Sequence, residues 1–171
     1  PYSGQAATFS ASSGITDSAA SGTCLATGKK TNNGVIGLAH DSTPVYSVAS
    51  QLKQQGWGVG IMTTVTIDHA TPSAHYAHAS SREDYYTIGT QLVESHFDFF
   101  GGAGFSRPID QNDTTAPNLY DLAKEKGYTL AAGYADATKQ LGSGKMILLP
   151  SNYRDKYTSY AGALPYAIDR T

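Results

Sequence analysis

The sequence contains a single cysteine, Cys24, so no disulfide can form within the chain and the compartment cannot be inferred from cysteine content. No apolar run is long enough to cross a membrane. Only 15% of the residues are charged, and 12 Lys and Arg against 14 Asp and Glu give a net charge of −2. This balance, together with the lack of a basic run, argues against a nucleic-acid partner.

The chain also lacks a signal peptide and an initiator Met, and both of its ends lie in polar sequence. We therefore expect a processed or excised piece of a longer protein. Its 171 residues suffice for one domain with a core, and neither an internal repeat nor a linker interrupts them. We expect a single domain over residues 1–171. The Gly-rich pieces 101–104 and 142–144 lack the spacing of dinucleotide or P-loop motifs and are interpreted as turns.

Hydrophobic spacing and breaker residues predict alternating helices and strands. Helices are predicted from Ser18 to a stop at Gly28 and over residues 44–55, 71–79, 83–94, 117–126 and 135–141. Strands are predicted over 5–10, 57–65, 97–100, 128–132 and 145–150, with 35–38 a short strand or buried loop and the last twenty residues irregular. This alternation favours an α/β fold with a largely parallel sheet flanked by helices.

The first chemically distinctive stretch is residues 15–38, ITDSAASGTCLATGKKTNNGVIGL. Asp, Ser and Thr are favoured N-cap residues, so a helix is predicted to begin at or next to Ser18. The unpaired N–H groups at a helix N-terminus bind anions, which suits a serine nucleophile that carries a phosphoryl group. The alternative for Ser18 is a purely structural cap, and Lys29 and Lys30 are interpreted as a solvated helix end.

The second stretch is residues 63–82, TTVTIDHATPSAHYAHASSR. A predicted strand leads into a polar elbow at Asp68 and His69, at the carboxyl end of the strand where ligands bind in open α/β sheets. Thr71 can also be read as an N-cap ahead of Pro72 at the first helical position.

Both stretches resemble the alkaline phosphatase family. TDSAASGT followed by LATGKKTNNGVIGL resembles its nucleophile segment, apart from Cys24 where the family usually has Ala. Two threonines, then His-Ala-Thr-Pro, Tyr-Ala-His and an arginine resemble its second motif. The resemblance implies that Ser18 is the phosphorylated serine, that Arg82 clamps the phosphate and that Asp17 orients Arg82. A guanidinium suits this role because it can grip two phosphate oxygens at once.

The resemblance also implies two zinc ions and one magnesium ion in the intact enzyme. Ser18 would bind zinc through its nucleophilic oxygen and Thr71 would ligate magnesium. His69 stands where some members have a magnesium-ligating Asp and others a His; since imidazole suits zinc better than magnesium, we expect it to act through a bound water and to line the substrate site. Motifs of the Asp-Gly-Met-Gly and Glu-Gly-x-x-Asp type, a later Asp-His pair and a final His are missing.

We therefore expect an internal fragment of the three-layer α/β/α alkaline phosphatase fold that has negligible turnover alone. The resemblance implies that the complete enzyme hydrolyses phosphate monoesters through a phosphoserine, and that it is a periplasmic or secreted homodimer. The remaining candidates receive no catalytic role: His75 and His78 are expected to be structural or exposed, and Asp68 a solvated acid or one acting indirectly at the site. His40 and His96 are assigned nothing.

Three alternatives stay open. One is a non-catalytic phosphate- or metal-binding module, such as a degenerate phosphatase. Another is a serine hydrolase of a different class, which needs a base near Ser18 and often a GxSxG elbow that this sequence lacks. The third is a purely structural domain, in which the joint presence of Ser18 and Arg82 would be coincidence.

Overall fold

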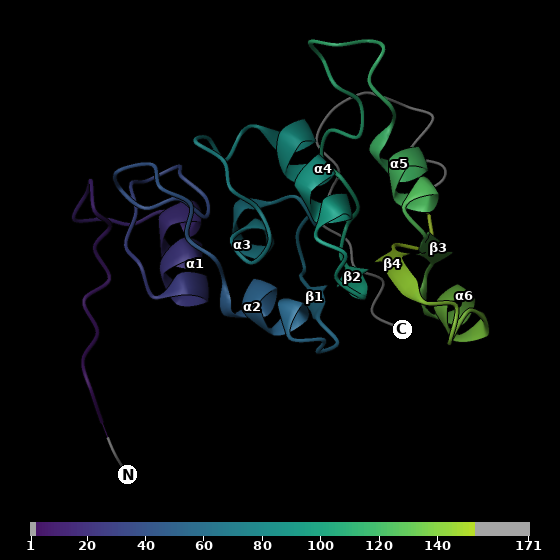
Figure 1. The fold of residues 1–171 in the computed structure, drawn as a ribbon, viewed down its shortest axis with the longest axis horizontal. Coiled ribbons are helices and arrows are strands. Elements are labelled where there is room, and N and C mark those ends of the chain that lie inside the picture. The colour runs from purple at the N-terminus through teal and green to yellow at the C-terminus, as the bar shows by residue number, and fades with distance from the viewer. Residues whose placement is uncertain (1–2, 153–171) are drawn as a thin grey trace.

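The computed structural model describes residues 3–152, in which helices and strands alternate along the chain (Figure 1). The helices are α1 (Ser18–Thr27), α2 (Val48–Gln54), α3 (Ala70–Ser73), α4 (Tyr85–Glu94), α5 (Leu119–Glu125) and α6 (Tyr134–Lys139). The strands are β1 (Gly60–Met62), β2 (Phe99–Gly101), β3 (Tyr128–Ala132) and β4 (Lys145–Leu149). No helix among these residues is long and apolar enough to cross a bilayer.

The four strands form one parallel sheet in the order β1-β2-β4-β3. The register pairs Ile61 with Phe100, and Phe100 with Ile147, which continues across the sheet to Leu130. Parallel neighbours need crossover connections, and the helices between the strands supply them. The predicted α/β fold with a parallel sheet is therefore confirmed.

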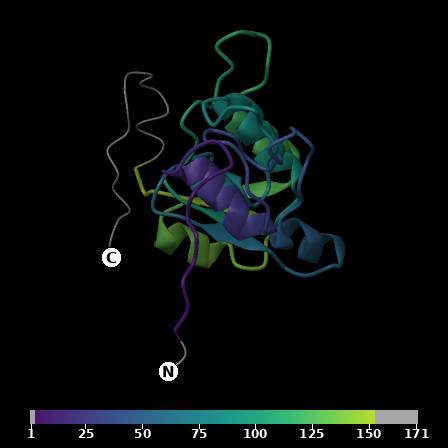
Figure 2. The same ribbon diagram turned by 90° about the vertical axis from the view of Figure 1, so that its left-hand side faces the viewer.

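The two faces of the sheet bury different clusters, because successive side chains of a strand point to opposite faces. The larger cluster includes Phe100 and Ile147 from the sheet and Ile88 and Leu92 from α4. The smaller cluster packs Ala137 of α6 against the other face. Figure 2 shows helices above and below the sheet, as expected for an α/β/α arrangement.

Several predicted elements are confirmed with nearly the expected bounds. β3 matches the prediction, α1 begins at Ser18, and α4, α5, α6, β2 and β4 lie where helices and strands were expected. Gly28 ends α1 in the left-handed conformation at φ 73°, and its N–H donates to the carbonyl of Cys24 at 2.8 Å. These elements follow from local capping and periodicity, which the sequence displays directly.

Other expectations were wrong in extent or in kind. Residues 5–10 form no strand, and the structure describes them as exposed except for Ser10. The strand expected over 57–65 is reduced to the three residues Gly60–Met62. The strand is not buried as expected, since Met62 is 74% exposed, and Trp57 ahead of it is 63% exposed. α2 begins only after Ser47, and α3 ends at Ser73. Most of the last twenty residues lie outside the described part of the chain.

The segment 35–38 is a buried loop rather than a strand, and it joins α1 to the chain that follows α3. Ile36 exchanges two backbone hydrogen bonds with Ala79, and the N–H of Gly37 donates to Oγ1 of Thr23 in α1 at 3.0 Å. A Cβ atom at Gly37 would overlap the carbonyl oxygen of Ala77. The loop therefore holds two distant segments together at close range.

Candidate active site

The N-terminus of α1 is capped by Asp17, which places Ser18 at the first helical position. Oδ1 of Asp17 accepts a hydrogen bond from the N–H of Ala20 at 2.9 Å, so the aspartate, and not Ser18, is the cap. The Ser18 side chain is half-buried, and its hydroxyl has no hydrogen bond with any residue among 3–152. The hydroxyl is thus free for chemistry at the positive end of the helix dipole.

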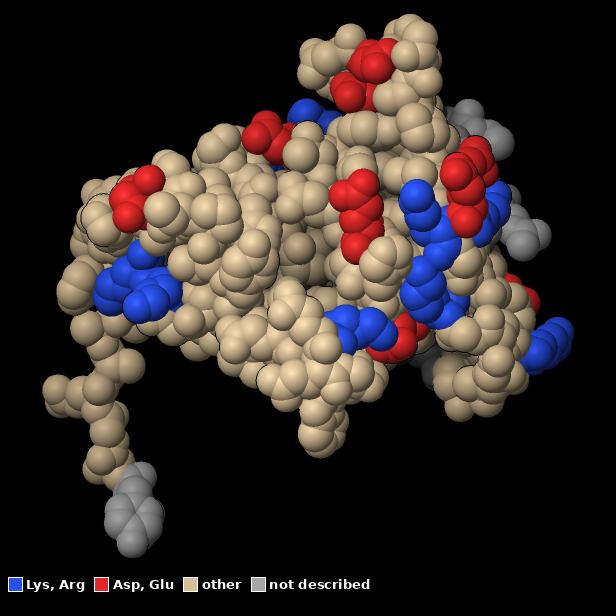
Figure 3. Space-filling view, in the orientation of Figure 1, with Lys and Arg blue, Asp and Glu red and all other residues tan. Residues whose placement is uncertain are grey.

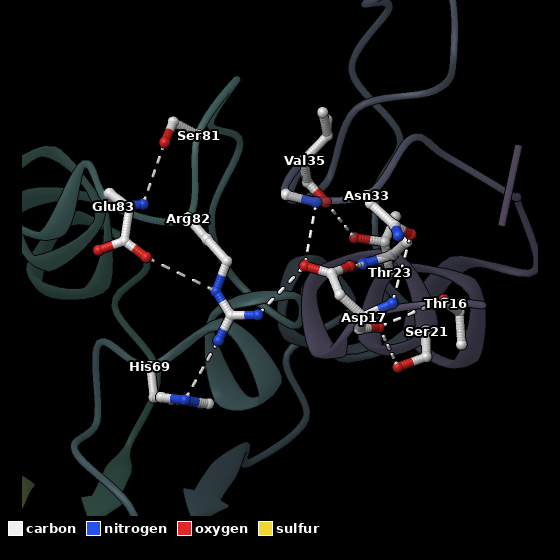
Figure 4. A network of polar contacts seen from close by, with 12 residues as sticks. Thr16, Asp17, Ser21, Thr23, Asn33, Val35, His69, Ser81, Arg82 and Glu83 are labelled. Atoms are coloured by element: carbon white, nitrogen blue, oxygen red, sulfur yellow. Dashed lines mark hydrogen bonds and ion pairs between the residues drawn. The ribbon is translucent and has the colours of Figure 1, made fainter. Parts of the chain in front are cut away.

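Arg82 reaches this helix end from 65 residues further along the chain. Its Nη1 donates to Oδ2 of Asp17 at 3.1 Å, and the two side chains are only 24% and 25% exposed (Figure 4). Oδ2 also accepts from the N–H of Gly34 at 3.0 Å. The predicted pairing of Asp17 with Arg82 is therefore present, and Ser18 follows Asp17 directly in the chain.

The pKa of Asp17 reflects two opposing effects. Burial raises it, but the hydrogen bonds from Ala20, Arg82 and Gly34 and the positive charge of Arg82 outweigh burial and leave the pKa below its ordinary value of 3.8. Asp17 is therefore anionic at neutral pH, which its ion pair with Arg82 requires.

His69 contacts the other end of the same guanidinium. Nη2 of Arg82 lies 3.3 Å from Nε2 of His69, and burial, followed by the charge of Arg82, lowers the pKa of this histidine. A neutral ring that accepts at Nε2 carries its proton on Nδ1. That Nδ1 atom is buried and has no partner among the described residues. Glu83 lies on the outer side of Arg82, with Oε1 at 4.0 Å from Nε.

Arg82 keeps donors available for a ligand in this arrangement. A guanidinium has five N–H donors, two on each Nη and one on Nε. One N–H of Nη1 is directed to Asp17 and one of Nη2 to His69, so each Nη keeps one N–H that makes no hydrogen bond within residues 3–152. Two N–H groups of one guanidinium can donate to two oxygens of a phosphate.

Thr71 lies in α3, which packs against α1. A Cβ atom at Gly22 of α1 would meet the backbone of Thr71 at 3.6 Å and the Cβ of Ala74 at 3.1 Å, so the two helices approach closely. Thr71 itself is exposed and its hydroxyl makes no hydrogen bond within residues 3–152. The N-cap of α3 is His69, so the interpretation of Thr71 as a cap and of Pro72 as the first helical residue is wrong.

Asp68 was expected to be either a solvated acid or one that acts indirectly at the site, and the structure contradicts the first of these two expectations. The residue is fully buried, and Oδ2 accepts from the N–H of Ser106 at 2.7 Å, while Oδ1 has no partner among the described residues. Burial raises its pKa to about 6 against hydrogen bonds from Thr66 and Ser106 that lower it. The loop that follows β2 covers this carboxyl, a long-range contact that the spacing of local residues does not reveal.

His75 and His78 do not share a helix, because α3 ends before them. His78 contacts the carbonyl of Val45 through Nε2 at 3.2 Å and packs edge-on against Tyr46, a structural role as expected. Two residues that the sequence interpretation missed, Asn33 and Gly34, contact the site directly. Their Asn-Gly pair was interpreted only as a turn.

The residues present do not form a metal site on their own. Within 3–152 no group of three or more His, Cys, Asp or Glu side chains lies close enough to hold an ion. Ser18 and Thr71 can each offer one free hydroxyl oxygen, which is fewer ligands than zinc or magnesium needs.

On the face shown in Figure 3, acidic and basic side chains are interspersed.

Comparisons with known proteins agree with this fold. The sequence profile of the family described as alkaline phosphatase matches residues 1–99. The chain is 46% identical over 80 residues to alkaline phosphatase 4 of Bacillus subtilis (strain 168), which covers 47% of this chain and 17% of that protein. It is 36% identical over 165 residues to the tissue-nonspecific alkaline phosphatase of Gallus gallus, covering 91% of this chain and 27% of that protein.

Solved structures show the same likeness. The alkaline phosphatase of the Antarctic bacterium TAB5 superimposes with a TM-score of 0.75 at 32% identity, covering 83% of this chain and 42% of that one. Variants of that enzyme, in which one histidine is replaced by glutamate or aspartate, are described with Mg bound in the M3 site.

The fold is an α/β/α arrangement around a parallel sheet. A serine lies at the capped N-terminus of α1, and an arginine binds the capping aspartate, so the chain is an α/β protein with a candidate phosphate site. The chain belongs to the alkaline phosphatase family. It spans 17 to 32% of the length of the first three curated relatives.

Proposed function

We propose that residues 1–171 form part of one domain and carry the nucleophile and the phosphate clamp of a phosphomonoesterase. The observation that carries the proposal is the network in which Asp17 caps the helix of Ser18 and also binds Arg82 at 3.1 Å. A nucleophile and a cation for phosphate are thereby fixed by one carboxylate. Family membership supports the same activity for the complete enzyme.

In the proposed reaction, Oγ of Ser18 attacks the phosphorus of a phosphate monoester. The bond to the ester oxygen breaks, the alcohol leaves with the proton that the serine gives up, and a phosphoserine remains. Water then hydrolyses the phosphoserine to inorganic phosphate and restores the hydroxyl. Arg82 and the N–H groups at the start of α1 hold the non-bridging oxygens as charge develops. Asp17 and His69 keep the guanidinium in place.

The proposal also includes metal ions, which we assign to the complete enzyme. We infer that the complete enzyme binds two zinc ions and one magnesium ion, with Ser18 and Thr71 each contributing one oxygen and His69 acting through water. Bound metals would activate the nucleophile and neutralise the leaving oxygen. Residues 3–152 contain no group of side chains that could hold a metal by itself, so we expect negligible turnover by this chain alone. Export and a homodimeric state are inferred from family resemblance.

The test is carried out on the complete enzyme. A phosphatase assay with p-nitrophenyl phosphate is expected to lose at least about 10³-fold in Ser18→Ala, because the step that forms the covalent intermediate is removed. Ser143→Ala, an exposed serine in a turn, serves as the matched control and should behave as wild type. Mass spectrometry of the acid-quenched enzyme should locate the phosphate on Ser18.

Two results would contradict the proposal. The first is full activity in Ser18→Ala, and the second is phosphate trapped on a different residue. Labelling of Ser18 by a fluorophosphonate, without trapped phosphate, would favour the serine hydrolase alternative. An enzyme that binds phosphate without turning over any monoester would favour the non-catalytic module.

A further inference from the structure

The Asn33-Gly34 pair lies between the two halves of the candidate site, and the proposed mechanism does not use it. The turn follows α1 in the chain but folds back beside the segment that leads into α1. On its other side lies the segment that carries Arg82. Figure 4 shows Asn33 beside Asp17, across from Arg82.

Asn33 binds the segment before α1 through three separate groups. Its backbone N–H donates to Oγ of Ser12 at 2.9 Å, and its Nδ2 donates to the carbonyl of Ile15 at 2.9 Å. Its Oδ1 accepts from the backbone N–H of Asp17 at 3.3 Å. A primary amide is the side-chain group that can donate to a carbonyl and accept from an N–H at the same time. The side chain therefore fixes the backbone immediately before Ser18.

Gly34 continues these contacts to the arginine. Its N–H donates to Oδ2 of Asp17 at 3.0 Å, the same oxygen that receives Nη1 of Arg82. Its carbonyl accepts from the backbone N–H of Arg82 at 2.7 Å. One dipeptide thus holds the backbone of Asp17, the carboxylate of Asp17 and the backbone of Arg82.

We propose that Asn33 is a positioning residue of the phosphate site. By holding the backbone of Asp17, it sets the distance between Ser18 and Arg82. The inference rests on the proposed function, since it assigns Asn33 to the same site. Asn33 itself is exposed and makes no hydrogen bond with the Ser18 hydroxyl or the Arg82 guanidinium. Its effect on phosphate is therefore transmitted through Asp17.

The energetic expectation follows from the two side-chain hydrogen bonds. Removing the amide in Asn33→Ala leaves the Asp17 N–H and the Ile15 carbonyl to water, so the backbone before Ser18 gains freedom. Geometry at a reacting centre is sensitive to shifts on the order of 1 Å. We expect the inhibition constant of inorganic phosphate to rise roughly 3- to 10-fold.

The experiment measures phosphate inhibition and kcat of the complete enzyme for wild type, Asn33→Ala and Asn32→Ala. Asn32 is the matched control, because its side chain makes no hydrogen bond within the described residues. A merely structural role would lower the amount of active enzyme, and therefore the apparent kcat, without changing the inhibition constant. A positioning role raises the inhibition constant.

Ser12→Ala provides a milder second variant, because it removes only the hydroxyl that holds the Asn33 backbone. It should raise the inhibition constant in the same direction by about twofold. An unchanged inhibition constant in Asn33→Ala, or an equal rise in Asn32→Ala, would overturn the assignment of Asn33 and leave the proposed function intact. A wild-type enzyme that neither hydrolyses a monoester nor binds phosphate would overturn the proposed function, and this inference with it.

Discussion

Asp17 and Arg82 lie 65 residues apart in the chain, yet Nη1 of the arginine is 3.1 Å from Oδ2 of the aspartate. The aspartate is also the N-cap of α1, so one carboxylate both begins the helix and binds the cation. A single residue at this point therefore couples local helix stability to the assembly of the candidate site.

Replacing Asp17 tests that coupling. Asp17→Asn can still cap α1 through its oxygen, but its NH₂ group faces the donors of Gly34 and Arg82. We expect the free energy of unfolding to fall by about 2 kcal/mol at neutral pH. Because the folded-state pKa of Asp17 lies below 3.8, its contribution is present above that value and is lost as the pH falls through the folded pKa.

The difference between wild type and Asp17→Asn should therefore shrink in acid. Urea unfolding at about pH 7 and about pH 3 measures it. Asp121→Asn is the control, since Asp121 forms only an exposed ion pair with Lys124 and should change the free energy by less than about 0.5 kcal/mol. A pH-independent difference for Asp17→Asn would contradict the role of the ionised carboxylate.

Arg82→Lys separates charge from geometry. Lysine keeps the positive charge but lacks the paired N–H groups, so it cannot bind Asp17, His69 and two phosphate oxygens together. We expect the inhibition constant of inorganic phosphate to rise at least about 10-fold in the complete enzyme. Arg107→Lys is the matched control and should have little effect. Cζ of Arg107 lies 5.2 Å from the centroid of the Tyr85 ring. Equal effects of the two changes would argue against a clamp at Arg82.

Local rules in the sequence were sufficient for most of the fold. The cap at Asp17 and the stop at Gly28 bound α1, and amphipathic spacing located α4 and α5. The predicted length of β1 was wrong, because the length of a strand depends on the neighbouring strand with which it pairs. β2 offers only three residues to pair with, so the apolar run from Trp57 onward does not continue as a strand.

The site was less predictable, because its contacts are long-range. No local pattern links Arg82 to Asp17, and family resemblance alone suggested that link. Gly34 contributes through its backbone, which leaves no side-chain signal in the sequence. From the sequence, Asp68 is a polar residue after a strand and resembles a solvated acid. In the folded chain, the loop that carries Ser106 covers it.

Gly37 tests the loop that joins α1 to the segment after α3. It has φ 61°, and a Cβ atom there would overlap the carbonyl oxygen of Ala77. Gly37→Ala should lower the free energy of unfolding by at least about 3 kcal/mol, from backbone strain plus steric overlap. Gly56→Ala is the control, because φ is 83° but nothing lies within 4 Å, so only the strain of about 1 kcal/mol remains. Similar losses in the two variants, measured by urea unfolding, would show that the close approach to Ala77 is not limiting.

Asp68 should make the stability of the chain depend on pH in the opposite sense to Asp17. Burial raises its pKa to about 6, so between the unfolded value of 3.8 and about 6 the folded state holds a proton that the unfolded state has released. The free energy that Asp68 contributes is therefore full below 3.8, falls as the pH rises to about 6 and stays constant above it. At roughly 1.4 kcal/mol per pH unit, the whole loss is about 3 kcal/mol.

Asp68→Asn removes this titration and keeps an oxygen for the Ser106 N–H. Relative to wild type, the variant should therefore gain stability between about pH 4 and pH 6, measured by urea unfolding across that range. Asp98→Asn is the control of opposite sign: the hydrogen bond from Lys53 holds the pKa of Asp98 below its ordinary value, so this variant should lose stability above about pH 4. A stability difference for Asp68→Asn that does not grow over this range would mean that Asp68 is ionised, and partnered, throughout.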